Sequence, residues 1–301
     1  MTDAVECLKL HTPAYKFLVA IDSDGCAFDT MEIKHKECFI PNIIKYWDMQ
    51  PISKYARAAA EFVNLYSKWR GINRFPALIK TIELLADWDA VQARKFNFPE
   101  TPNLRQWIAE ETKLGNPALK AWCADHSAEE APDMHRALAW SLAVNESVTD
   151  IVKGGLPPFP YVRECLEAAR LKADLMVCSQ TPTEALVREW EEQDMDQYVF
   201  TINGQEMGTK SEHIRFASEG RYENTKILMI GDAFGDLKAA RANDALFFPI
   251  NPGEEERSWQ RLFEEGLDKF FSGTFAGEYE GHLIREFETF LPETPSWKRH
   301  I

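Results

Sequence analysis

Two aspartates near the N-terminus, Asp22 and Asp24, directly follow an apolar run in the segment FLVAIDSDGCAFDT (17–30). A short, continuous apolar run predicts a buried strand, so both carboxyl groups would lie just beyond the end of that strand. One of them could attack an electrophile as a nucleophile, and the other could donate or accept a proton. The alternative is an ordinary polar turn, because Asp-Gly pairs favour turns.

Three further polar groups follow later apolar runs. Ser179 ends the run 173–179, and Asp232 ends the run 225–232, with Asp236 four residues further on. Ligands of open parallel sheets sit beyond the carboxyl ends of the strands, so we expect these side chains to lie close to the first pair. Ser179 could instead only cap a helix, and Asp236 could only favour the N-terminus of the helix that follows.

A lysine lies between these two runs, in the segment GTKSEH (208–213). Thr209 and Glu212 form a capping-box pattern, which would make Lys210 the first residue of a helix. A cation is disfavoured at a helix N-terminus, so this placement suggests that an anion lies nearby. The alternative is a solvated lysine on the surface.

Together these groups could handle a phosphoryl group. Several carboxylates in one place repel one another unless a divalent cation is bound, and oxygen ligands suit Mg²⁺. A magnesium ion, a lysine and a serine hydroxyl would neutralise and orient a phosphoryl group. One aspartate could then attack phosphorus in line, while the other, when protonated, donates a proton to the leaving oxygen.

The elements that must position these groups alternate between strands and helices. Segment 161–171 spaces its apolar residues like one face of a helix, and segment 181–193 begins with Thr181 as the expected N-cap, followed by Pro182 and by Glu184 in a capping box. Such alternation predicts an α/β fold with a parallel sheet. The expected strands are 16–22, 173–179, 225–232 and 244–250.

The long segment between the first two expected strands contains no convincing strand. Its apolar residues recur at helical spacing, as in PALIKTIELL (76–85). We therefore expect residues 33–155 to form an all-helical domain, inserted into an α/β core made of residues 1–32 and 156–301. The Gly/Pro-rich segment 153–160 is the expected returning hinge.

The order of the polar groups resembles one enzyme family. DSDG (22–25), the strand-ending Ser179, Lys210 and GDAFGD (231–236) together resemble the haloacid dehalogenase superfamily, in its phosphatase form with a helical cap after the first motif. The resemblance covers the chain except its far C-terminal tail, and the four elements in this order are highly specific. It implies a Rossmann-like parallel sheet with helices on both faces, and a helical cap at 33–155.

The resemblance also implies catalytic roles. Asp22 would be the nucleophile that forms an aspartyl-phosphate. Asp24 would protonate the leaving group and then activate water as a base. Ser179 would hydrogen-bond the phosphoryl oxygens, and Lys210 would stabilise the negative charge on the nucleophile and the phosphate.

Further residues would bind substrate and metal. Gly25 and Gln180 join Ser179 and Lys210 as candidates for phosphate or substrate binding. The implied cofactor is Mg²⁺. It would be held by the Asp22 side chain, the Asp24 backbone carbonyl and Asp232, with Asp236 acting directly or through water.

Other positions bear on the subgroup. Members that cleave carbon–halogen bonds lack an acid at the position of Asp24, so this residue favours phosphate-ester chemistry. Cys26 replaces the usual Thr or Val and is expected to pack. His35 lies one residue beyond the His of the phosphomutase-like subgroup, which would shift its helical phase by about 100°.

The polar break WRGINRF (69–75) is the candidate for substrate contacts. The alternatives to a phosphatase are a phosphomutase and a non-catalytic binding protein with the same fold.

The amino-acid composition limits which partners and which cellular location we expect for the protein. The chain has 301 residues, of which 45% are hydrophobic and 27% charged, which predicts a packed soluble protein. A formal net charge of −14 without a basic cluster argues against a nucleic-acid partner. We find no signal peptide and no apolar run long enough to span a membrane, and the six cysteines are expected to be reduced. We therefore expect a cytoplasmic protein acting on a small phosphate ester, with substrate and oligomeric state left open.

Overall fold

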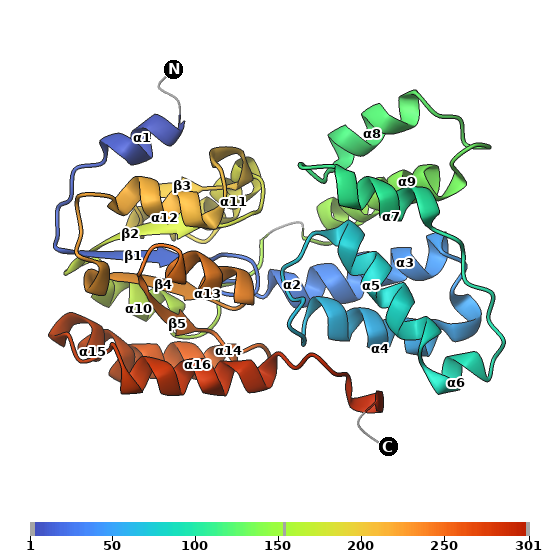
Figure 1. Ribbon diagram of the computed structural model, residues 1–301. Coiled ribbons are helices and arrows are strands. Elements are labelled where there is room, and N and C mark those ends of the chain that lie inside the picture. The colour runs from blue at the N-terminus through green and yellow to red at the C-terminus, as the bar shows by residue number, and fades with distance from the viewer. Residues whose placement is uncertain (1–3, 153–154, 299–301) are drawn as a thin grey trace. The chain divides into compact units, whose positions relative to one another are not determined.

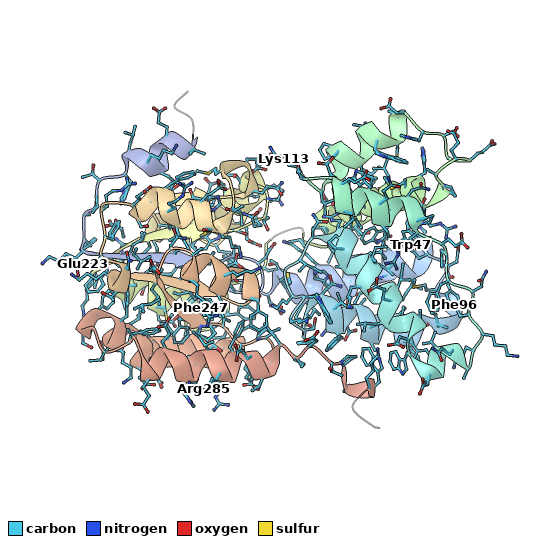
Figure 2. All side chains as sticks on the ribbon, viewed as in Figure 1. Trp47, Phe96, Lys113, Glu223, Phe247 and Arg285 are labelled. Carbon is cyan, nitrogen blue, oxygen red and sulfur yellow. The ribbon has the colours of Figure 1, made fainter. Side chains whose placement is uncertain are left out.

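The computed structural model describes residues 4–152 and 155–298, which form two compact units (Figure 1). The sheet unit contains the described residues of Met1–Met31 and Gly154–Leu291. The helical unit contains those of Glu32–Lys153 and Pro292–Ile301. Each unit has its own core. In Figure 2, Trp47 lies among the side chains of the helical unit and Phe247 among those of the sheet unit, and both side chains are fully buried.

Five parallel strands form the sheet in the order β3-β2-β1-β4-β5. The central strand β1 pairs with β2 on one side and β4 on the other, so Ile21 lies opposite both Val177 and Ile230. This register brings the segments after β1, β2 and β4 to one edge of the sheet. The four expected strands are confirmed, and β3 was not predicted. The bounds are β1 (Phe17–Ile21), β2 (Ala173–Cys178), β3 (Thr201–Asn203), β4 (Ile227–Gly231) and β5 (Leu246–Pro249).

Helices cover both faces of this sheet, which confirms the predicted α/β class with a Rossmann-like core (Figure 1). Because alternate residues of a strand point to opposite faces, Val19 and Ile21 pack in one apolar cluster and Leu18 and Ala20 in the other. The α-helices are α1 (Ala4–Leu10), α10 (Val162–Ala169), α11 (Thr183–Glu192), α12 (Lys210–Ser218), α13 (Phe234–Arg241), α14 (Glu255–Arg261), α15 (Leu267–Ser272) and α16 (Glu278–Phe290). Short 3₁₀ or π turns are η3 (Asp196–Tyr198), η4 (Gln205–Met207), η5 (Asn224–Lys226) and η6 (Leu262–Gly266).

The helical unit has helices throughout its described part and no strand there. The segment 76–85, predicted to be helical, lies in a helix, and its Leu78, Ile82 and Leu85 are buried. The polar break is also found, since α4 ends at Asn64 and α5 begins at Arg74. Helices of this unit are α2 (Thr30–Ile33), which begins in the sheet unit, η1 (Lys34–Phe39), α3 (Ile40–Tyr46), η2 (Gln50–Ile52), α4 (Ser53–Asn64), α5 (Arg74–Ala86), α6 (Asp89–Gln92), α7 (Pro102–Glu110), α8 (Asn116–Ala124), α9 (Pro132–Ile151) and η7 (Ser296–Lys298).

The C-terminal segment leaves the sheet unit after α16 and packs on the helical unit. The Trp297 ring stacks on that of Trp88 with 4.1 Å between centroids, and Lys298 forms an ion pair with Asp87. This tail was expected to belong to the core formed by residues 1–32 and 156–301, because its local sequence gives no sign of a contact with the helical unit. The first residues of the expected hinge, Lys153 and Gly154, lie outside the described residues. The role of the helical unit as a cap stays a prediction.

Two expectations from composition can be compared with the structure. Five of the six cysteines are free and buried, whereas the side chain of Cys7 lies outside the described part. No described helix combines the length and the hydropathy that a bilayer crossing requires.

Candidate active site

Asp22 is the first residue after β1, and each of its two carboxylate oxygens has a partner. Its backbone N–H continues the sheet by donating to the Ile230 carbonyl at 3.0 Å. Its Oδ1 accepts from the backbone N–H of Ser23 at 2.8 Å, and its Oδ2 lies 2.7 Å from Lys210 Nζ. The side chain is only 6% exposed. The strand therefore delivers a buried carboxylate to an ammonium group.

A tight turn follows Asp22. The Ser23 carbonyl accepts from the backbone N–H groups of Cys26, Ala27 and Phe28. Gly25 adopts a φ of 74°, and its N–H donates to the Phe28 carbonyl at 2.9 Å. A positive φ is readily adopted only by glycine, so Gly25 has a conformational role here. The turn keeps Asp24 at the same edge of the sheet as the preceding aspartate.

Two hydroxyls hold the half-buried carboxylate of Asp24. Thr30 Oγ1 donates to its Oδ1 at 2.5 Å, and Thr181 Oγ1 donates to its Oδ2 at 2.7 Å. The predicted N-cap role of Thr181 is therefore wrong. Helix α11 begins at Thr183, and the backbone N–H of that residue donates to Glu206 at 3.0 Å. The Thr181 hydroxyl therefore donates to the carboxylate of Asp24, and the carboxylate of Glu206 accepts from the N-terminus of α11.

Lys210 is the first residue of α12, as predicted. Thr209 is the N-cap, and the capping box with Glu212 is complete. The ammonium lies 2.7 Å from Asp22 Oδ2 and 2.5 Å from Asp236 Oδ1. Burial alone would lower the pKa of Lys210, but the two carboxylates outweigh it and raise the pKa well above its usual range. The group therefore stays charged, and the anion expected near this helix start is present.

Asp232 directly follows β4 and Asp236 lies in the first turn of α13, and both are buried. Asp236 Oδ2 accepts from the backbone N–H groups of Asp232 at 3.2 Å and Ala233 at 3.0 Å, which caps α13. Its Oδ1 faces Lys210. Both readings of Asp236 thus apply, because one oxygen caps the helix and the other takes part in the charged cluster.

The cluster fits an oxygen-coordinated divalent cation. Carboxylate oxygens of Asp22, Asp232 and Asp236 all lie within 4.8 Å of one another. Burial, and then repulsion from the neighbouring carboxylates, raises the pKa of Asp22 and of Asp236, and the positive charge of Lys210 offsets this only in part. A divalent cation would compensate this excess of negative charge, and the all-oxygen donor set suits Mg²⁺. The part assigned to the Asp24 carbonyl stays a prediction.

Ser179 follows β2 at the same edge of the sheet and is 2% exposed. Its backbone N–H donates to the Asn203 carbonyl at 3.0 Å, and its Oγ accepts from the Thr181 N–H at 3.2 Å. Gln180, the next residue, is exposed, and its amide donates to the Gly208 carbonyl at 2.9 Å. The Gln180 side chain therefore connects two loops, and its predicted contact with substrate stays a prediction.

Comparisons with known proteins give the following. No protein-family model and no curated protein matches the sequence. The structure is similar to β-phosphoglucomutase from Clostridium difficile, at 13% identity and a TM-score of 0.49, over 86% of this chain and 98% of that one. A haloacid dehalogenase-like hydrolase from Streptococcus pneumoniae is 12% identical, with a TM-score of 0.41 over 81% of this chain and 90% of that one. Another, from Xanthomonas campestris, is 13% identical, with a TM-score of 0.41 over 86% of this chain and 96% of that one.

Two of these names are those of haloacid dehalogenase-like hydrolases. At such low identities the argument about function depends on the residues of this chain. The charged cluster of Asp22, Lys210, Asp232 and Asp236 carries that argument.

Cys26 and His35 were singled out in the sequence, and the structure shows their surroundings. Cys26 is fully buried, its thiol lies 3.7 Å from the Ile230 carbonyl, and burial raises its pKa, all of which agree with the expected packing role. His35 lies in the π-helix η1 with its ring centroid 4.6 Å from that of Phe39. The predicted shift of about 100° in the helical phase of His35 holds for a regular α-helix and not for the wider turn found in η1.

Sequence reasoning missed two residues of the site. Thr30 lies six positions after Asp24 and was not singled out, although its hydroxyl contacts that carboxylate. Thr181 was read as a cap. The contact between Thr181 and Asp24 cannot be read from their separation in the sequence, because the two residues meet only when β1 and β2 pair.

Proposed function

We propose that this chain is a magnesium-dependent phosphatase that hydrolyses a phosphate monoester of a small metabolite through an aspartyl-phosphate on Asp22. The single observation that carries the proposal is the buried Asp22 carboxylate. It lies against Lys210, in reach of two further carboxylates that could share a cation. The helical unit would act as a cap that excludes water and macromolecular substrates.

In the first step, a carboxylate oxygen of Asp22 bonds to phosphorus, and the bond to the leaving oxygen breaks. Asp24 gives its proton to that oxygen. In the second step, Asp24 takes a proton from water, the water oxygen bonds to phosphorus, and the Asp22–phosphorus bond breaks. The hydroxyls of Thr30 and Thr181 suit both states of Asp24, because a hydroxyl can donate to the carboxylate and can accept from the acid.

The other groups would bind the phosphoryl group. Lys210 supplies a fixed positive charge beside the nucleophile, and Ser179 offers a hydroxyl at the same edge of the sheet. Mg²⁺, when bound by the aspartates, would neutralise the charge of the phosphoryl oxygens.

A screen for phosphate release tests this function and narrows the substrate. The panel contains sugar phosphates, nucleotides and amino-acid phosphates, each with and without EDTA. Release from at least one substrate class supports a phosphatase. If the protein instead converts a sugar phosphate into its isomer in a coupled assay, without net release, it is a mutase. Inactivity in both assays would favour a non-catalytic binding protein.

Removal of divalent cations is expected to abolish phosphate release, because the excess negative charge around Asp22 would then repel the phosphate ester. The measurement is the initial rate with EDTA and again after excess Mg²⁺ is added. The circular dichroism spectrum should not change, because the fold has its own apolar cores. A rate that is undiminished by EDTA would rule out the cation requirement.

Replacing Thr181 with Val should lower kcat by about ten- to a hundredfold, because Asp24 loses one of the two hydroxyls that orient it. Thr30 remains, so some activity should persist. Thr183→Val is the matched control, since it removes a neighbouring hydroxyl that binds Glu206 instead. Equal rates for both variants would show that the Thr181 hydroxyl does not position the acid.

A further inference from the structure

The turn after β1 is held by two hydrogen bonds that come from outside it. Ser23 and Cys26 are both fully buried. The Ser23 hydroxyl accepts from the indole N–H of Trp190 at 3.0 Å, and the Cys26 carbonyl accepts from the indole N–H of Trp259 at 2.8 Å. A buried oxygen that lacks a donor costs stability, so each of these bonds favours the observed conformation of the turn.

Trp190, on α11, holds the start of the turn through Ser23. The Ser23 hydroxyl donates its own proton to Glu189 Oε2 at 3.1 Å, so α11 fixes this hydroxyl both as an acceptor and as a donor. The indole ring also packs against Phe28, with 5.7 Å between the ring centroids and an angle of 76° between the planes. Helix α11 therefore contacts the turn at its start and at its end.

Trp259 holds the middle of the turn from a different helix, α14. Its partner Cys26 directly follows Gly25, whose φ is 74°, and the Cys26 N–H donates to the Ser23 carbonyl at 3.2 Å. The indole rings of both tryptophans are fully buried in the same apolar cluster of the sheet unit. Two helices thus fix the turn that carries Asp24, and neither tryptophan belongs to the four motifs of the sequence analysis.

Burial alone does not explain these two bonds. Trp47 is also fully buried, in the helical unit (Figure 2), yet its indole N–H has no partner among the described residues. The indole N–H groups of Trp140 and Trp297 are likewise buried without a partner in the described part of the chain. This protein therefore tolerates a buried indole N–H that is unpaired, whereas those of Trp190 and Trp259 both donate to the turn between the aspartates and Phe28.

We propose that Trp190 and Trp259 are positioning residues of the active site, whose indole N–H groups hold the 23–28 turn in the geometry that presents Asp24 beside Asp22. Proton transfer by Asp24 depends on its direction, so a looser turn would slow the reaction without weakening substrate binding. This effect on rate rests on the proposed function. The hold on the turn does not, and it can be measured without a substrate.

Amide hydrogen exchange of the full chain, followed by mass spectrometry, tests the hold on the turn. Trp190→Phe and Trp259→Phe keep an apolar ring and remove the indole donor. In both variants, peptides that cover residues 23–28 should exchange at least about tenfold faster than in the parent. Trp47→Phe is the matched control, because it removes the same ring volume from a buried site without removing a hydrogen bond. Exchange in these peptides should not change in the control.

Steady-state kinetics, with the substrate found in the phosphate-release screen, separate positioning from a purely structural role. Trp190→Phe and Trp259→Phe should each lower kcat about tenfold and leave KM within about twofold of the parent, whereas Trp47→Phe should change neither.

Ser23→Ala removes the acceptor of the Trp190 indole, so it should lower kcat to a similar extent. Combined with Trp190→Phe it should be no slower than either single variant, because both changes remove the same hydrogen bond. Ser23→Ala also stands in for Trp190→Phe if that variant does not fold.

Unchanged exchange in both tryptophan variants would overturn the proposal, whether or not activity is found. Faster exchange with an unchanged kcat would overturn it too, because the turn would then be held for stability alone. If no substrate is found, exchange decides by itself. Faster exchange in both variants, but not in Trp47→Phe, then supports the hold on the turn, and only the proposed function fails.

Discussion

Replacing Asp22 with Asn is expected to lower phosphate release by on the order of 10⁴-fold or more, because an amide cannot attack phosphorus. Asn has the shape of Asp and removes one of three neighbouring negative charges. Lys210 would keep its contact with Asp236. The unfolding free energy should therefore stay within about 1 kcal/mol of the parent. The measurements are the rate of phosphate release and a urea unfolding curve.

Asp268→Asn is the matched control, since Asp268 is an exposed aspartate on α15. It should leave both the rate and the unfolding curve unchanged. If Asp22→Asn retained a substantial fraction of the activity, Asp22 would not be the nucleophile. If it lost activity only because the chain unfolded, the urea curve would reveal this.

Replacing Gly231 with Ala should damage both the fold and the site. A Cβ at Gly231 would lie 2.3 Å from the Cβ of Asp236 and 2.4 Å from its Cγ, which is closer than real contacts allow. Asp236 would have to move away from the N–H groups of Asp232 and Ala233 and from Lys210. We expect a loss of about 3 kcal/mol of unfolding free energy. The rate of phosphate release should fall about a hundredfold as the charged cluster loses its geometry.

Gly235→Ala separates this clash from a general effect of alanine. Gly235 lies inside α13, and a Cβ there would meet no atom within 4 Å. Alanine should stabilise that helix by up to about 1 kcal/mol. Urea unfolding and the rate of phosphate release compare the two variants. Similar behaviour of Gly231→Ala and Gly235→Ala would contradict the close packing of Asp236 against the backbone.

The parts of the fold that the sequence predicted are those in which local pattern and final contacts agree. β1, β2, β4 and β5 are continuous apolar runs because they are buried on both faces. β3 has only the three residues Thr201–Asn203, too few for a pattern, and it depends on pairing with β2. Lys210 was placed correctly because its capping box lies within four residues.

The parts that could not be predicted depend on contacts between distant segments. Thr181 has every local feature of an N-cap, yet its hydroxyl binds Asp24, which is 157 residues away along the chain. The requirement for Gly231 arises only when α13 folds back on the end of β4. Trp297 gives no local sign that it stacks on Trp88. In each case the tertiary structure decides between roles that the local sequence allows equally.

The most direct test of the account is to trap the covalent intermediate. A substrate carrying radiolabelled phosphate is mixed with the protein, and the reaction is stopped with acid during turnover. Borohydride reduction then converts a phosphorylated aspartate to homoserine, which mass spectrometry locates in the chain. The account predicts homoserine at position 22, and no trapped label in Asp22→Asn. Label on another residue, or steady phosphate release without any trapped label, would contradict it.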